Sequence, residues 1–173
     1  MSNKLLSIYL TDHLAGATAG VALAQRAAKH SAGTPAGRRL AQVAHEIEAD
    51  RETLRHLMSE LGIRHSPGKN VASWLVERLS RLKPNGRAGG EMQLQRMHEL
   101  ETLSLGIAGK LALWESLAAA PEAAAAGRID LDELIDRARS QRERVEMERI
   151  TLARGALSLS PAGRDHAVTP RTS

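Results

Sequence analysis

The segment LAQVAHEIEADRETLRHLMSELG, residues 40–62, decides the kind of fold that we expect for this chain of 173 residues. Its apolar residues recur at alternating spacings of three and four, which is the period of a helix face that packs into a core. They are Leu40, Val43, Ile47, Leu54, Leu57 and Leu61. The position of this seam between Ile47 and Leu54 is held by Asp50. The segment therefore predicts a helix whose buried face contains one carboxylate.

The ends of this helix are predicted by local chemistry. Thr34 precedes Pro35, and a hydroxyl cap followed by proline at the first helical position is a helix start. Gly62 closes the helix after Leu61, because glycine readily adopts the conformation that ends a helix. On the outer positions of the same helix stand His45, Glu48, Glu52 and His56, which we expect to be solvated.

Three further segments carry a helical period, and we expect helices over 3–29, 91–119 and 130–157. A short helix is expected over 70–82, inside the long connection 63–90. Short loops make the first two and the last two long helices antiparallel pairs, and the long connection can cross the length of the bundle. The prediction is an all-α, up-down-down-up four-helix bundle domain at 1–157, followed by a disordered tail at 158–173.

The composition agrees with a single helical domain. Hydrophobic residues make up 42% and aromatic residues 2%, so Leu, Ala, Ile, Val and Met must build the core, and this set favours helices. The absence of cysteine excludes disulfides, thiolate metal sites and cysteine nucleophiles. The start of the chain lacks a signal-peptide pattern and the longest apolar run, 14–24, is too short to span a bilayer. We therefore expect a cytoplasmic protein.

Basic residues gather around the long connection, although the formal net charge is only +4. Four of them are expected to form a basic surface beside the short helix: Arg78, Arg81, Lys83 and Arg87. Together with Trp74, they allow the interpretation of a peripheral binder of an anionic membrane or polyanion. The alternative is a helix packed across the bundle end with its basic side in water. Motifs for specific nucleic-acid recognition, phosphate loops and nucleophilic catalysis are missing from the sequence.

Three stretches carry a family resemblance: IYLTDHLAGATAG (8–20), residues 40–62 and MHELETLSLGIAGKLALWESL (97–117). They resemble small bacterial proteins of the ferritin-like superfamily, and the resemblance covers residues 4–157. It implies a four-helix bundle with a carboxylate on each of two helices and Glu-x-x-His on the other two, holding iron. The chain departs from that pattern, because neither the helix over 35–61 nor the one over 130–157 contains Glu-x-x-His.

Two interpretations of the interior remain open. Counting along the helices places five residues near one level, and with iron or manganese they would form a non-standard metal site: His13, Glu46, Asp50, Glu101 and Glu148. The other interpretation is a buried polar network without metal: Asp50, Lys110, Gln141 and Arg142, with Arg137 as a further donor. A buried carboxylate needs a cation or hydrogen-bond donors in either case.

The sequence favours the second interpretation, because the histidines of the family motif are missing and protein cations are at hand. We expect a non-enzymatic structural or interaction module without a cofactor, able to form a homodimer through an Ala-rich helix face. A ferritin-like protein that binds iron or manganese is the first alternative. A peripheral binder that uses the basic connection is the second.

Overall fold

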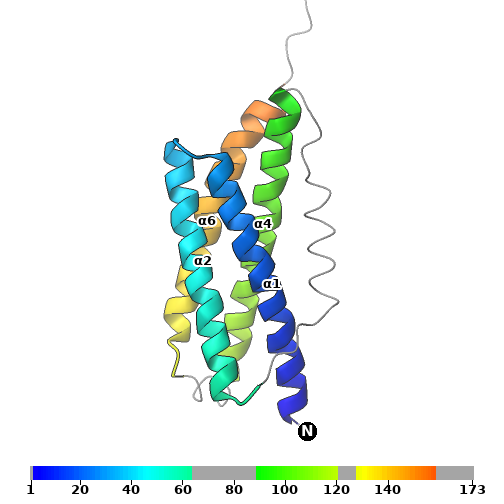
Figure 1. Cartoon of the computed structure of the whole chain (residues 1–173), viewed down its shortest axis with the longest axis vertical. Helices are drawn as coiled ribbons and strands as arrows, with labels where there is room; N and C mark the ends of the chain where they lie inside the picture. The colour runs from blue at the N-terminus through cyan, green and yellow to red at the C-terminus, as the bar shows by residue number, and fades with distance from the viewer. Residues whose placement is uncertain (1, 64–88, 121–127, 159–173) are drawn as a thin grey trace, which may run out of the picture.

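The computed structural model describes residues 2–63, 89–120 and 128–158. Within these ranges the chain forms four α-helices and no strand: α1 (Ser2–His30), α2 (Pro35–Glu60), α4 (Gly89–Ala118) and α6 (Leu131–Ala156). Figure 1 shows them lying side by side along the long axis of the molecule. The predicted all-α architecture with four long helices is confirmed, and every predicted helix end lies within two residues of the observed one.

Three predictions lie outside the described residues. They are the short helix over 70–82, the basic surface that contains Arg78, Arg81, Lys83 and Arg87, and the tail after Ser158.

The caps account for the well-predicted helix ends. The Thr34 hydroxyl accepts a hydrogen bond from the Gly37 amide at 3.0 Å, and Asp130 accepts one from the Glu133 amide at 3.0 Å. Each cap satisfies an amide that has no partner inside its helix. Gly62 has a φ of +66°, in the left-handed region where a side chain is strained, and the chain leaves α2 at this point.

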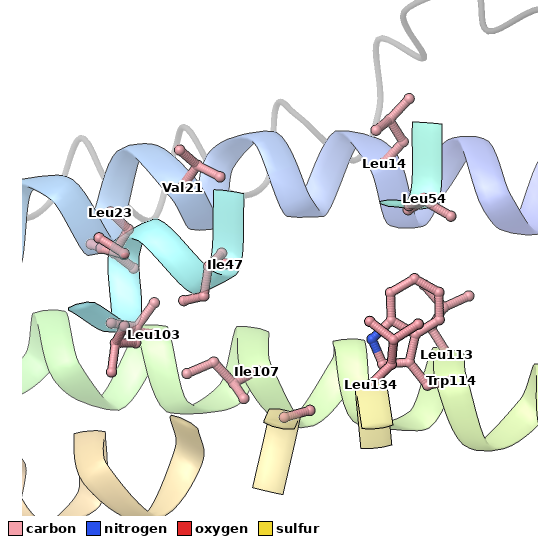
Figure 2. Packing of buried hydrophobic residues seen from close by; sticks show 14 of the residues in the cluster. Leu14, Val21, Leu23, Ile47, Leu54, Leu103, Ile107, Leu113, Trp114 and Leu134 are labelled. Carbon is pink, nitrogen blue, oxygen red and sulfur yellow. The ribbon is translucent and has the colours of Figure 1, made fainter. Parts of the chain in front are cut away.

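The core lies between the four helices. α1 packs against α2, α4 packs against α6, and the two pairs meet through contacts of α1 with α4 and of α2 with α6. Figure 2 shows side chains from all four helices meeting, with Leu14 of α1, Leu54 of α2, Trp114 of α4 and Leu134 of α6 among them. Burying each large apolar side chain contributes about 1.5–3 kcal/mol. Searching the described helices finds none that is both long and apolar enough to cross a membrane.

Candidate functional site

Asp50 occupies the seam of α2 and is 1% exposed. Arg137 of α6 donates from Nε to its Oδ1 at 2.8 Å, and Gln141 of α6 donates from Nε2 to its Oδ2 at 3.1 Å. The ammonium of Lys110, on α4, also donates to Oδ2. One carboxylate therefore joins three helices, and both of its oxygens are occupied by donors.

Lys110 is the most deeply placed cation of this cluster. Its ammonium donates to Gln141 Oε1 as well as to Asp50. Burial lowers the pKa of Lys110, and the negative charge of Asp50 offsets this effect only in part. The amine of Lys110 therefore binds its extra proton less readily inside the protein than it would in water.

Arg137 connects the cluster to the surface. Its guanidinium binds Asp50 inside and Glu133 at 2.9 Å outside, one turn earlier on α6. Arg142, which the sequence suggested as a donor, is exposed on α6 and makes no contact with Asp50. The observed network is thus Asp50, Lys110, Gln141 and Arg137.

Glu46 lies one turn before Asp50 and has a partner of its own. The guanidinium of Arg144 binds both of its carboxylate oxygens, at 3.0 Å from Nη1 to Oε1 and by a second bond from Nη2 to Oε2. Burial alone would raise the pKa of Glu46, but the hydrogen bonds and charge of Arg144 outweigh it and lower the pKa. This carboxylate is therefore held in its charged form by the protein.

The other three candidate metal ligands, Glu148, Glu101 and His13, also lie away from Asp50 and contact partners of their own. Glu148 is buried and pairs with Arg39 at 2.6 Å, while Glu101 pairs with Arg149 at 3.7 Å. His13 packs edge-on against the Tyr9 ring, with centroids 4.5 Å apart. Burial lowers the pKa of His13, and the nearby charge of Asp12 only partly opposes this.

The structure does not gather the five candidate metal ligands, His13, Glu46, Asp50, Glu101 and Glu148, into one group. In the part of the chain that is described, no cluster of three or more His, Asp or Glu side chains could hold a metal ion. Each of the four carboxylates faces a separate protein cation instead. This donor set does not fit a di-iron centre.

A further buried carboxylate, Glu99 of α4, was missed by the sequence analysis. It is 1% exposed and faces the end of α1, where His30 Nδ1 lies 2.9 Å from its Oε2. Arg26 Nε lies 3.0 Å from its Oε1, an ion-pair distance, although the two groups are not aligned as a hydrogen bond. Glu99 therefore ties α4 to α1 by charge.

Comparison of this chain with protein-family models, with curated proteins and with solved structures finds no match.

Proposed function

We propose that this protein is a non-enzymatic, ferritin-like helical bundle that serves as a structural or interaction module. The observation that carries the proposal is the Lys110 ammonium on Asp50. A protein cation there supplies the positive charge that a buried carboxylate requires. Three donors already engage the two oxygens of Asp50, so a base or metal-ligand role for this carboxylate would compete with the charges of Lys110 and Arg137.

The proposal includes the up-down-down-up order of the helices. The order of contacts between α1 and α4 supports it, since early Tyr9 meets late Ser116 and late Arg26 meets early Glu99. Contacts between α2 and α6 run in the same reversed sense: Arg39 with Glu148, Glu46 with Arg144, and Asp50 with Arg137. The colour gradient in Figure 1 is consistent with neighbours that all run in opposite directions.

Metal analysis tests the absence of a metal-dependent function. We expect protein purified without a tag, after growth with iron and manganese, to carry less than about 0.2 metal per chain. The value should be the same in Asp50→Ala and in Glu52→Ala, an exposed control on the same helix. One or two metal ions per chain in the wild type, lost in Asp50→Ala and kept in Glu52→Ala, would overturn the proposal.

We expect the interaction to include self-association through an Ala-rich helix face. Sedimentation velocity over a range of micromolar protein concentrations measures it, because a homodimer dissociates on dilution. A dimer supports this part of the proposal. A monomer at every concentration contradicts it and leaves the Asp50 cluster as the supported feature.

Neither alternative function is favoured by a contact among the described residues. The metal-binding alternative lacks a gathered ligand set, as described above. The membrane or polyanion alternative depends on Arg78, Arg81, Lys83 and Arg87, which lie outside the described ranges, so it stays a prediction. Its test is salt-sensitive binding to anionic vesicles or DNA, compared with a variant in which Arg78, Arg81 and Lys83 are neutralised.

A further inference from the structure

The polar contacts that hold α1 against α4 differ between the two halves of α1. In the C-terminal half, residues 17–30, Arg26 and His30 lie 3.0 Å and 2.9 Å from the carboxylate of Glu99, which is buried on α4. In the N-terminal half, residues 2–16, the one polar contact with α4 among the described residues is the exposed hydrogen bond from the Tyr9 hydroxyl to Ser116, at 3.2 Å. Charge therefore ties only the C-terminal half of α1 to α4.

Apolar packing is also thinner along the N-terminal half of α1. Leu10 and Leu14 are buried there, whereas Leu5 and Ile8 are 74% and 50% exposed. The C-terminal half buries four apolar side chains: Val21, Leu23, Ala24 and Ala27. A cavity of about 320 Å³ lies between α1, α2 and α4, and α1 lines it from Asp12 to Leu23. Segments with few buried contacts open locally more readily than the rest of a protein, so we expect the N-terminal half to open first.

His13 is the histidine of this weaker contact. Its ring lines the cavity and packs edge-on against Tyr9, with centroids 4.5 Å apart, and Tyr9 in turn makes the hydrogen bond to Ser116. Among the described residues, neither ring nitrogen of His13 has a hydrogen-bond partner. A positive charge on this ring would face a mainly apolar wall without an acceptor from the protein, which is unfavourable.

The charged groups around His13 do not remove this cost. Those that line the same cavity come from three helices: Asp12 of α1, Asp50 and Arg51 of α2, and Lys110 of α4. Asp50 binds Lys110, and Arg51 binds Glu52 at 2.8 Å, so among the described residues only Asp12 remains to stabilise a protonated ring. Burial lowers the pKa of His13 below the usual 6.5, and the charge of Asp12 opposes this only in part. The ring therefore takes up a proton more readily when α1 has moved away from α4 than when it is packed there.

We propose that His13 makes the contact between the N-terminal half of α1 and α4 sensitive to acid, so that protonation of its ring releases this half of the helix while Glu99 keeps the C-terminal half in place. Release uncovers Leu10 and Leu14, so the protein presents this apolar surface only at mildly acidic pH. The proposal goes beyond the function proposed above and would hold for a bundle of any role.

Amide hydrogen exchange of the full chain, measured residue by residue by NMR at about pH 7.5 and about pH 5, tests the proposal. This range stays above 4.5, the usual pKa of Glu46 and Glu146, so these two glutamates contribute little to the change. After correction for the intrinsic pH dependence of exchange, protection of the amides of residues 10–16 should fall more than about threefold in acid, and that of residues 21–28 should fall by less. The C2–H signal of the His13 ring should titrate below pH 6.5.

Two substitutions remove the titrating group, and a third serves as the control. His13→Gln and His13→Phe take up no proton in this range, and phenylalanine preserves an aromatic ring beside Tyr9. In both variants, protection of residues 10–16 should fall no more in acid than that of residues 21–28. His98→Gln, at an exposed position of α4, should behave like the wild type.

Several results would overturn the proposal. One is an equal loss of protection in both halves of α1, which would mean that acid acts on the whole bundle. Another is unchanged protection of residues 10–16 in the wild type, or a His13 ring that titrates at or above pH 6.5. A third is a loss confined to the N-terminal half that persists in both His13→Gln and His13→Phe, which would assign the acid sensitivity to another group.

Discussion

Asp50 illustrates how one residue can join elements that are far apart in sequence. Its donors come from α4 and α6, so the carboxylate on α2 is satisfied only when three helices are in place. Replacing a complete buried ion cluster by apolar residues is often neutral, whereas removing one partner leaves an uncompensated charge. We therefore expect the cluster to specify the arrangement of the helices more than it adds to their stability.

The first prediction concerns this imbalance. Asp50→Leu should lower the free energy of unfolding by about 3–5 kcal/mol, because it leaves the Lys110 ammonium without its carboxylate and removes one of the two acceptors of the Arg137 guanidinium. The double variant Asp50→Leu/Lys110→Met should recover a large part of that loss. Urea unfolding of both variants and of Lys110→Met completes a double-mutant cycle.

An additive cycle would contradict the prediction, because two groups that contact each other inside the protein should be coupled. So would an Asp50→Leu variant within about 1 kcal/mol of the wild type, the size expected for a surface pair.

The second prediction concerns the pH dependence that Glu46 contributes. Its pKa is lowered from the usual 4.5, so the unfolded chain takes up this proton first as the pH falls. The stabilisation is complete above pH 4.5 and is lost as the pH falls through the lower folded value. Glu46→Gln should therefore flatten the decrease of stability below pH 4.5, measured by urea unfolding. Glu52→Gln, an exposed control on the same helix, should leave it steep.

At the scale of helices, the sequence predicts where a helix begins and ends better than which of its side chains face a given neighbouring helix. Thr34 and Asp130 cap their helices through amides three residues away, so the signal is contained in a few adjacent positions. Asp50 was recognised as buried because its neighbours in the seam are apolar. Both inferences need only local information, and both are confirmed.

The rotation of one helix against another was harder to predict. Gln141 and Arg137 are four residues apart and share one face of α6, whereas Arg142 is turned by about 100° from Gln141. Counting residues from the helix ends also misplaced Glu101 and Glu148 along the bundle. Glu148 pairs with Arg39, which precedes Asp50 by eleven positions on α2, and Glu101 pairs with Arg149 beside Glu148. At 1.5 Å per residue, both glutamates lie roughly 15 Å from the level of Asp50.

Glu99 was missed for a related reason. Gln95, Glu99 and Thr102 form a buried polar row on α4, and Gly106 and Gly109 follow at the same helical spacing. A polar and glycine-containing row has the sequence pattern of a solvated face, since hydrophobic periodicity recognises only apolar stripes. The charged partners that make burial of Glu99 possible lie 69 or more positions earlier, at the end of α1.

The third prediction compares two glycines in helices. A Cβ on Gly37 would lie 2.1 Å from the carbonyl oxygen of Ser31, whereas one on Gly20 would meet nothing. Gly37→Ala should destabilise the protein by about 1–3 kcal/mol, because backbone atoms of the loop before α2 must move. Gly20→Ala should stabilise it by up to about 1 kcal/mol through helix propensity. Thermal unfolding of the two variants measures the difference.

The same sign for both glycine variants would contradict this prediction. Destabilisation by both would mean that the space beside Gly20 is filled.

Across the whole molecule, the two helix pairs are joined by two different kinds of contact. Between α2 and α6 the described contacts include three ion pairs, from Arg39, Arg137 and Arg144. Between α1 and α4 lie the Glu99 pair and, further along, a cavity of about 320 Å³ that residues of α2 also line. The ion pairs between α2 and α6 fix how far the two helix pairs are shifted along each other. The contact between α1 and α4 is less complete, because it includes the cavity.

The last prediction concerns the stability of the whole protein against pH. Among the described residues, four groups have a shifted pKa, which is lowered in each case: Glu46, Glu146, His13 and Lys110. A lowered pKa, in an acid or a base, means that the unfolded chain binds more protons between the folded and unfolded values, so stability rises with pH through that interval. The intervals end near 4.5 for the two glutamates, 6.5 for His13 and 10.5 for Lys110.

The positive net charge acts in the same direction, since it falls as the pH approaches the isoelectric point near 10.0. The free energy of unfolding should therefore keep rising from pH 4 to pH 9.5, instead of reaching its maximum near neutrality. Urea unfolding at several pH values measures the profile. Asp50→Leu/Lys110→Met should remove its alkaline part, and His13→Gln should remove the contribution that ends near pH 6.5 while the contribution of the two glutamates below pH 4.5 remains. A wild type that loses stability between pH 7 and 9.5, while the double variant does not, would mean that Asp50 stabilises the ammonium of Lys110 more than burial disfavours it.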